Sequence, residues 1–499
     1  MATTSAKTYR NYIGGEWVEA AGGESFETRN PATGETLGVF PLSTTKDMDR
    51  AVEAAKAAFE EWRLVPAPKR GELLFRVAQA FVERKDELTE QMVREMGKVR
   101  AEAAGDVQEA IDMTFYMAGE GRRMFGHTTP SELPDKFMMS TRNPVGVVGA
   151  ITPWNFPIAI PSWKIAPALV CGNTVVFKPA EDTPLLASLF VEIFEEAGLP
   201  PGVLNIVHGA GETVGEHLVK HPDVPLISFT GSREVGAQVQ TNAGPYLKNV
   251  HLELGGKNAI IVMDDADVDL AVDGILWSAF GTSGQRCTAA SRVIAGASVY
   301  DALASHLVER AERMQLGDGL DDATDVGPVI SQAALEKIHS YTGIGKDEGA
   351  RLLTGGEVAT ENGLDRGFFY RPTVFADVEP DMRIAQEEIF GPTTALIRAS
   401  DVDEAIRIAN GVKYGLSSSI FTRDVNKAFK AMRDLKTGIT YINAGTTGAE
   451  VHLPFGGTKD TGNGHREAGQ AALDFYTEWK SIYVDYSGKL QRAQIDNAE

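Results

Sequence analysis

The stretch VGVVGAITPWNFPIAIPSWKIAPALVCGNTVVFKP, residues 145–179, decides the expected fold. It opens with an apolar, valine-rich run at 145–152, and a second such run follows at 174–179. Pro157 can start a helix between the two runs, because its fixed φ suits a first helical turn. Strand-like runs separated by helices are typical of a parallel sheet that carries helices on both faces.

The same alternation continues as far as residue 256. Further apolar runs are VLNIVHG at 203–209, LISFTG at 226–231 and VHLELGG at 250–256. The helical patterns PLLASLFVEIFEEAG at 184–198 and ETVGEHLVKH at 212–221 lie between them. The predicted fold class is therefore α/β, with a doubly wound parallel sheet whose ligands bind outside the carboxyl ends of its strands.

The regions before and after this sheet have patterns of their own. Residues 12–40 read as short strands and turns, and helical spacing of apolar residues covers 46–62, 71–97 and 106–125. Strand-like runs and amphipathic helices alternate again over 257–455, which predicts a second α/β region.

Two polar, extended segments stand apart from both regions. Residues 130–144 are polar, and EWKSIYVDYSG at 478–488 reads as a β-strand far along the chain from the core it would join. We expect the two segments to form a small separate sheet.

Composition limits the partners and the compartment. The chain has 499 residues, which predicts two or three domains, and its net charge of −21 argues against nucleic acid or an anionic membrane as a partner. No apolar run could span a bilayer, the first residues lack the apolar core of a signal peptide, and two cysteines exclude a disulfide framework. We expect a cytoplasmic protein, and no metal site, because the nine histidines show no metal-type spacing.

Cys287 lies in FGTSGQRCTAASRV, residues 280–293, which cannot be an ordinary helix interior because Gly281 and Gly284 weaken a helix. Arg286 stands beside it. A thiol in a polar turn next to a cation is a candidate nucleophile, because the thiolate is the reactive form and positive charge favours it. The alternative is a small buried core cysteine.

Polar residues follow the first two strands of the sheet. Asn155, in TPWNFP, is either a donor to a developing oxyanion or a helix cap. Lys178 and Glu181, in FKPAEDTP, could hold hydroxyls or phosphates and the ribose diol of a nucleotide, where the carboxylate would repel a 2′-phosphate. The alternative for this pair is a solvated loop with capping charges.

Two further motifs follow the next strands. In SFTGSREVG, Gly231 opens a helix capped by Ser232, which would let a pyrophosphate approach bare N–H groups, and Arg233 either contacts a phosphate or points to solvent. In LELGGK, Glu253 lies in an apolar strand, so desolvation would raise its pKa towards that of a general base. Its alternative is a buried glutamate satisfied by neighbours.

Seven motifs occur in the order seen in the aldehyde dehydrogenase superfamily: TPWNFP, FKPAE, SFTGSREVG, LELGGK, GQRC, EEIFGP and PFGG. The chain resembles this family from NYIGGEWV at 11–18 to TEWKS at 477–481, nearly its whole length. The resemblance implies an NAD-binding domain at 1–124 and 145–255 and a catalytic domain at 256–455. It also implies an oligomerisation sheet at 125–144 and 470–489, followed by a C-terminal tail at 490–499.

The resemblance also implies site residues. Cys287 matches the nucleophile, Glu253 the general base, and Asn155 the oxyanion donor, which acts with the Cys287 backbone N–H. Lys178 is also assigned to the catalytic set, together with Glu467, which matches a second glutamate of the proton relay. The cofactor-binding positions are Ile151, Thr152, Pro153, Trp154, Lys178, Glu181, Gly211, Gly215, Phe229, Thr230, Gly231, Ser232, Gly236, Leu254, Glu388 and Phe390.

The chemistry implied is oxidation of an aldehyde through a Cys287 thiohemiacetal and thioester, which water activated by Glu253 hydrolyses. Acylating relatives usually lack this glutamate, so its presence favours hydrolysis. Glu181 favours NAD, while Arg233, which replaces a commoner threonine, leaves NADP possible. His465 is an additional residue compared with the commoner GxGRE spacing of the family. The motif alone therefore does not fix the position of Glu467 in the site. The family forms homodimers and homotetramers.

The substrate is expected to be a semialdehyde with a distal carboxylate. VQE at 107–109, GQRCT at 284–288 and the TTGAE loop, part of 443–450, resemble the aminoadipate-semialdehyde branch, and CTAASR resembles the glutamate-semialdehyde branch. Bare N–H groups of the small, polar loop could receive a carboxylate. The expected substrate residues are Glu109, Arg286, Thr288, Gly448, Ala449 and Phe455.

Other functions remain open at this point. One is a broad-specificity dehydrogenase for medium-chain aldehydes. Another is a cysteine hydrolase in which His208 or His251 assists Cys287, although nothing places a histidine beside the cysteine and such an enzyme would not need the nucleotide loops. A third is a binding or structural protein on a dead scaffold, against which the intact Cys287, Glu253 and Asn155 speak.

Overall fold

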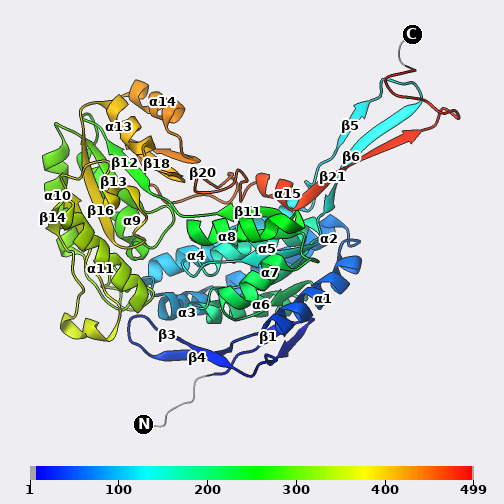
Figure 1. Cartoon of the computed structure of the whole chain (residues 1–499), viewed down its shortest axis with the longest axis horizontal. Helices are drawn as coiled ribbons and strands as arrows, with labels where there is room; N and C mark the ends of the chain where they lie inside the picture. The colour runs from blue at the N-terminus through cyan, green and yellow to red at the C-terminus, as the bar shows by residue number, and fades with distance from the viewer. Residues whose placement is uncertain (1–6, 497–499) are drawn as a thin grey trace.

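The computed structural model describes residues 7–496 and contains two large sheets and a projecting three-stranded arm (Figure 1). The first sheet has the strand order β11-β10-β7-β8-β9-β1-β2. Five of its strands are parallel to one another, and they are β7 (Val147–Ile151), β8 (Thr174–Lys178), β9 (Leu204–Ile206), β10 (Leu226–Thr230) and β11 (Asn249–Glu253). The predicted doubly wound α/β fold is confirmed.

Alternation along each strand divides the side chains between two cores. Val148 of β7 and Phe177 of β8 belong to the core under five helices, which are α2 (Ala67–Glu83), α3 (Lys85–Met96), α4 (Arg100–Glu120), α5 (Ala159–Cys171) and α6 (Pro184–Glu196). Val147 and Val176 belong to the opposite core, under α1 (Thr45–Trp62), α7 (Glu216–Lys220) and α8 (Arg233–Ala243). Both faces are therefore buried, which explains the continuous apolar runs.

The chain reverses its direction across the sheet between β7 and β10. From β7 it proceeds to β8 and β9 on one side, and it then returns to β10 and β11 on the other. Such a switch point opens a crevice at the carboxyl ends of the two central strands, where ligands of open α/β sheets bind. The segments that follow β7 and β10 therefore lie at the expected binding edge.

The single helix expected over 71–97 is two helices, α2 and α3, joined at Arg84. No glycine or proline marks the joint. The Arg84 guanidinium reaches Glu87, and it also pairs with Glu192 and Glu196 of α6. The bend lets the apolar faces of both helices enter one core, so tertiary packing overrides the local helical pattern.

Some predicted element boundaries also shift. The pattern at 212–221 is a π-helical turn over Gly211–Gly215 followed by α7. The N-terminal strands are β1 (Asn11–Ile13) and β2 (Glu16–Val18), which edge the first sheet, and β3 (Ser25–Arg29) and β4 (Thr36–Pro41), which form a separate pair.

The second sheet has the order β14-β15-β16-β13-β12-β18-β19 and confirms the second predicted α/β region. Its strands are β12 (Asn258–Val262), β13 (Ala290–Gly296), β14 (Arg351–Thr354), β15 (Thr373–Ala376), β16 (Thr393–Ala399), β18 (Ser417–Phe421) and β19 (Ile439–Ile442). The helices α9 (Val268–Phe280) and α10 (Tyr300–Arg313) cover one face, and α11 (Gln332–Asp347) and α13 (Val402–Asn410) cover the other.

The arm joins the two segments expected to pair. Its strands are β5 (His127–Pro130), β6 (Lys136–Pro144) and β21 (Thr477–Asp485), all antiparallel, and they project away from the body (Figure 1). The sheet begins at Thr477 rather than at 470, because α15 (Ala471–Phe475) packs into the core beside α5. Residues 490–496 of the tail follow the arm, and the remainder of 490–499 lies outside the described residues.

Residues 7–496 contain neither a candidate membrane-spanning helix nor a candidate metal-binding cluster. No helix in this range combines the length and the apolar character that crossing a bilayer requires. No group of three histidine, cysteine, aspartate or glutamate side chains in this range could hold a metal ion.

Candidate active site

The Cys287 loop begins where α9 ends at Phe280. Thr282, Ser283 and Gly284 all adopt positive φ, at 53°, 54° and 68°. The break in the helix was expected from the glycines, whereas the left-handed conformation of Thr282 and Ser283 was not. A side chain at Gly284 would place its Cβ 2.1 Å from the carbonyl oxygen of Gly391, so only glycine fits there.

A carboxylate on α4 holds this strained turn. Glu102 accepts the Thr282 N–H at 2.8 Å, and the Ser283 hydroxyl donates to the carbonyl of Gly327 at 2.7 Å. Left-handed backbone costs about 1–2 kcal/mol per non-glycine residue, and these buried hydrogen bonds offset that cost. The loop is therefore fixed in place before any ligand binds.

The Cys287 thiol is neutral in this resting site. Burial, followed by the charges of Glu388 and Glu253, raises its pKa to about 12, while a hydrogen bond from the Thr288 N–H opposes this rise. Arg286 does not make the thiolate the resting form as expected, because its guanidinium is already engaged. It pairs with Glu102 at 3.0 Å and stacks on Trp277, and burial outweighs its charge.

Asn155 turns towards the Cys287 loop. Its side-chain amide donates to the carbonyl of Gln285 at 3.1 Å, and the residue is buried. It caps no helix, because α5 begins at Ala159, whose N–H donates to Asp106 of α4. The helix-cap alternative for Asn155 is therefore excluded, and so is a start of α5 at Pro157.

Glu253 ends β11 as a buried carboxyl. Burial, followed by the charge of Glu467, raises its pKa well above the ordinary value, as the apolar surroundings predicted. One carboxyl oxygen, Oε1, lies 3.2 Å from Nε2 of His251, and the other, Oε2, has no hydrogen-bond partner. This free oxygen is available to a water molecule or to the thiol.

Glu467 lies beside Glu253 and forms a buried ion pair with Lys164 of α5. Lys164 also donates to the hydroxyl of Ser228 at 3.2 Å, and Ser228 accepts in turn from Tyr476 at 3.1 Å. The structure thus brings Glu467 into the site despite the extra His465.

The positions expected to bind the adenosine ribose include a carboxylate and two glycines. Glu181 accepts from Lys178 at 2.8 Å and from the Gly211 N–H at 2.6 Å, and its side chain is 41% exposed. A Cβ at Gly211 or Gly215 would lie 3.8 or 3.9 Å from Lys178, an ordinary van der Waals contact. A carboxylate beside a glycine-lined surface fits a ribose diol.

The positions expected to bind a pyrophosphate lie at the start of α8. Ser232 caps this helix, and a Cβ at Gly231 would lie 2.5 Å from the Phe229 ring. A Cβ at Gly236 would lie 2.5 Å from Leu254. Bare N–H groups at the N-terminus of α8 suit a phosphate, whereas Arg233 is engaged with Asp460 at 3.2 Å.

The residues expected beside a nicotinamide include a second carboxylate and an aromatic pair. Glu388 accepts the Gly256 N–H at 2.8 Å, and the rings of Trp154 and Phe390 meet edge to face at 5.5 Å. Trp154 follows β7, directly after the expected positions Ile151, Thr152 and Pro153, while Thr230 ends β10. Carboxylates at both ends with glycines between them fit an extended dinucleotide.

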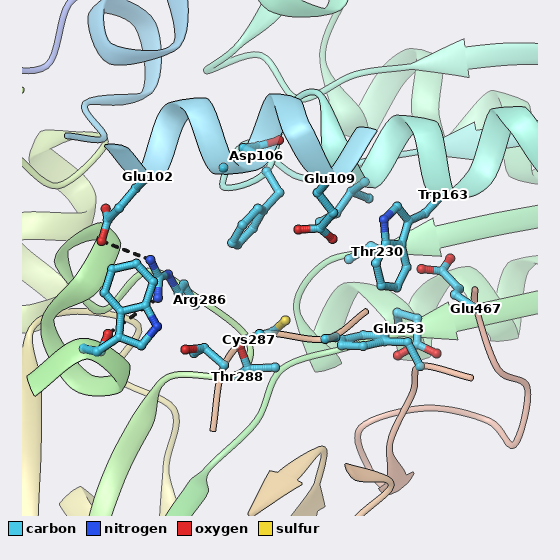
Figure 2. Close-up of a pocket in the computed structure, with 18 of the residues that line it drawn as sticks. Glu102, Asp106, Glu109, Trp163, Thr230, Glu253, Arg286, Cys287, Thr288 and Glu467 are labelled. Atoms are coloured by element: carbon cyan, nitrogen blue, oxygen red, sulfur yellow. Dashed lines mark hydrogen bonds and ion pairs between the residues drawn. The ribbon is translucent and has the colours of Figure 1, made fainter. Parts of the chain in front are cut away.

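A cavity of about 290 Å³ opens beside Cys287 (Figure 2). Acidic residues of α4 line one wall, Trp163 and Phe455 meet edge to face at 5.1 Å in another, and Glu253 and Glu467 lie at one end. All six expected substrate residues line this cavity: Glu109, Arg286, Thr288, Gly448, Ala449 and Phe455.

The polar groups of the cavity are mostly neutral or paired. Burial, followed by the charge of Asp106, raises the pKa of Glu109 to about 8, so this carboxyl is protonated at neutral pH. Asp106 is paired with Lys98 at 2.6 Å. The buried hydroxyl of Thr447 has no hydrogen-bond partner. The cavity therefore offers hydrogen-bond donors without a free carboxylate from α4.

The family follows from a comparison with known proteins. The family model described as "Aldehyde dehydrogenase family" matches residues 17–482. The chain belongs to the aldehyde dehydrogenase family. This aldehyde dehydrogenase is therefore an oxidoreductase that acts on the aldehyde group, as the seven motifs indicated.

Relatives and solved structures agree over nearly the whole chain. The alpha-ketoglutaric semialdehyde dehydrogenase of Bacillus subtilis is 43% identical, covering 96% of this chain and 99% of the relative. The malonate-semialdehyde dehydrogenase 3 of Geobacillus kaustophilus is also 43% identical, and the match covers 97% of this chain and 100% of the relative. The structure of betaine aldehyde dehydrogenase of Staphylococcus aureus, solved with NAD+, matches with a TM-score of 0.95 at 38% identity. The match covers 97% of this chain and 96% of that chain.

Two residues of this aldehyde dehydrogenase site, Lys164 and Glu102, were not predicted from the sequence, and His251 was considered only as a partner of Cys287 in a hydrolase. Lys164 is a lysine inside an otherwise apolar stretch, and His251 stands two positions before Glu253, on the same strand face. Glu102 precedes Glu109 by two helical turns and therefore shares its face of α4. Each left a signal in the pattern, but only the folded chain shows what these side chains contact.

Proposed function

We propose that this protein oxidises an aldehyde to its carboxylic acid with NAD, through a thiohemiacetal and a thioester on Cys287. The observation that carries the mechanism is that Cys287 and Glu253 line one cavity, while Asn155 donates to the backbone of the Cys287 loop. No histidine lines the cavity beside Cys287 within the described part of the chain, which disfavours the cysteine-hydrolase alternative. NADH formation with an aldehyde tests this proposal directly.

The protein's own groups divide the work of the first step. The sulfur of Cys287 adds to the aldehyde carbon, and the thiol proton passes to a base, for which Glu253 has a free oxygen. Asn155 and the Cys287 backbone N–H stabilise the oxyanion that develops. NAD, when bound, supplies the acceptor for the hydride that leaves this carbon.

Hydrolysis of the thioester follows. Glu253 takes a proton from water, and the hydroxide attacks the thioester carbon, which releases the acid and restores the thiol. The raised pKa of Glu253 makes it a strong enough base for this step near neutral pH. The ion pair of Lys164 and Glu467 lies next to Glu253 and can carry the proton away from it.

We propose NAD over NADP because of Glu181. Its carboxylate suits the two ribose hydroxyls and repels a 2′-phosphate. NAD bound to the Staphylococcus aureus relative supports the same choice.

Glu181→Gln should reduce the preference for NAD. We expect the ratio of kcat/KM with NAD to that with NADP to fall about tenfold or more, since the repulsion of the 2′-phosphate is lost. Steady-state kinetics with both cofactors measure it, with Glu196→Gln on α6 as the control. A higher kcat/KM with NADP in the wild-type protein would contradict the proposal.

The proposed substrate is a semialdehyde that bears a distal carboxylate. Protonated Glu109, the free hydroxyl of Thr447 and the Arg286 side chain offer donors to such a group, and the Bacillus and Geobacillus relatives are named for carboxylate semialdehydes. The apolar part of the lining favours medium-chain aldehydes as the second candidate. It consists of Phe156, Ile160, Trp163, Leu254 and Trp277.

Competition between a carboxylated semialdehyde and an uncharged aldehyde of equal length decides between these candidates. Thr447→Val should lower kcat/KM for the carboxylated substrate about tenfold and leave the uncharged one unchanged, because this hydroxyl has no partner to lose inside the protein. Arg286→Ala should change the same ratio, and Arg286→Lys, which keeps the charge, should change it less. A higher efficiency with the uncharged aldehyde, unaffected by Arg286→Ala, would refute the carboxylate proposal.

We further propose a cytoplasmic homodimer or homotetramer assembled through the arm. Phe137, Trp479 and Tyr483 are exposed on its strands, and β21 is an edge strand of its sheet. We also propose the domain limits predicted from the sequence, at 124, 145, 255 and 455. Sedimentation analysis of the purified chain tests the oligomeric state.

A further inference from the structure

His251 and Glu253 share one face of β11. Side chains alternate along a strand, and Val250, Leu252 and Leu254 pack into the core on the opposite face, under α8. His251 and Glu253 therefore both face the loop that carries Glu467. That loop runs alongside β11, since the Leu254 N–H donates to the carbonyl of Thr461 at 2.8 Å.

The imidazole of His251 makes one hydrogen bond, to Glu253. Nε2 lies 3.2 Å from Oε1 of Glu253, whereas Nδ1 lies 3.8 Å from Oε1 of Glu467 and has no hydrogen-bond partner. Nε2 faces a carboxyl oxygen and is the donor when that group is ionised, and Nδ1 is then the bare nitrogen. A buried acceptor without a partner costs less than a buried donor without one.

Packing fixes the plane of this ring. Phe475 of α15 meets it at 4.8 Å and His465 at 5.6 Å, both edge to face, and His251 is 1% exposed. The imidazole cannot turn away from Glu253 without disturbing these contacts.

Gly456 lies close to the Glu253 carboxyl group and leaves room for it. A Cβ at Gly456 would lie 2.7 Å from Oε1, and Gly456 has a φ of 148°, which favours glycine. The carboxyl group is thus seated between His251 and the backbone at Gly456, with Oε2 left free.

We propose that His251 is a positioning residue for the base Glu253: its Nε2–H holds Oε1, favours the ionised carboxylate and leaves Oε2 to accept the proton from water. This inference rests on the proposed role of Glu253. The histidine itself neither gains nor loses a proton during the reaction.

The charges around this pair agree with that role. Lys164 of α5, together with His465 and Arg466 of the adjoining loop, adds to burial in lowering the pKa of His251, so the imidazole stays neutral. Burial and Glu467 raise the pKa of Glu253, while Lys164 and Arg466 oppose this. Among the described residues, His251 is the only one whose side chain forms a hydrogen bond with the Glu253 carboxyl group.

Two variants separate the hydrogen bond from the volume of the side chain. His251→Leu removes the donor, and His251→Gln keeps an amide donor within reach of Glu253. With rapid mixing, the first turnover reports hydride transfer as a burst of NADH, and the later steady state reports deacylation. For His251→Leu we expect the burst to remain and the pH midpoint of deacylation to rise by about one unit, because a bond to the charged form is lost.

For His251→Gln we expect a midpoint close to that of the wild-type protein. Equal midpoints in all three proteins, or an equal rise in both variants, would overturn the positioning role. Failure of the wild-type protein to form NADH with an aldehyde would instead refute the proposed function, so the two failures are distinct.

A second measurement does not depend on either variant folding. In wild-type protein labelled with ¹⁵N-histidine, the resonance lost in a His251 variant of any kind, or assigned by selective labelling, should show a neutral ring protonated at Nε2 over the pH range in which Glu253 is ionised. A ring protonated at Nδ1, or a charged ring, over this range would overturn the inference.

Discussion

Cys287→Ala should abolish NADH formation. We expect turnover to fall by about four orders of magnitude or more, because the covalent step has no other nucleophile in the cavity. The affinity for NAD, measured by fluorescence titration, should stay within about twofold, since the groove that we assign to the cofactor is formed by other residues. Assays of NADH absorbance with a saturating semialdehyde measure the loss.

The second cysteine of the chain supplies the matched control. Cys171 ends α5, is fully buried, and lines no part of the cavity. Cys171→Ala should therefore retain the wild-type rate. Substantial turnover in Cys287→Ala, or equal losses in both variants, would refute Cys287 as the nucleophile.

Glu253→Gln should slow deacylation by about 10²- to 10⁴-fold, the range for loss of a general base. Glutamine keeps the size of the side chain but cannot take a proton from water. An acyl-enzyme should accumulate after a single turnover, detected as a mass increase on the peptide that contains Cys287. Glu95→Gln is the control, because Glu95 is a buried glutamate that accepts the N–H groups of Leu185 and Leu186 and lies outside the cavity.

The wild-type rate of deacylation should depend on pH through the same residue. The pKa of Glu253 is raised, so the carboxylate that acts as the base predominates only above that raised pKa. The rate should therefore fall as the pH drops through a midpoint well above that of an ordinary glutamate. A rate that stays constant down to pH 5, or a Glu253→Gln variant with the wild-type rate at neutral pH, would exclude Glu253 as the base.

Local patterns in the sequence determined the layers and the edge where the site lies. Continuous apolar runs such as 145–152 are required wherever a strand is buried on both faces, so they could be read directly. Gly284 and the polar residues around it predicted a break before Cys287, and the leucines beside Glu253 predicted its desolvation. Each of these signals depends on neighbours in the chain.

Contacts between distant segments decided the electrostatics of the site. The sequence places Arg286 beside Cys287 but does not reveal its partner Glu102, which lies 184 residues away. Burial, followed by the charges of Glu388 and Glu253, keeps the thiol neutral at rest, and the fold brings these groups together. Lys164 meets Glu467 across 303 residues. The sequence alone determined which groups could react, since residue type and local burial set that. The tertiary structure alone decided which of them are charged, because a buried charge depends on the partner that the fold brings to it.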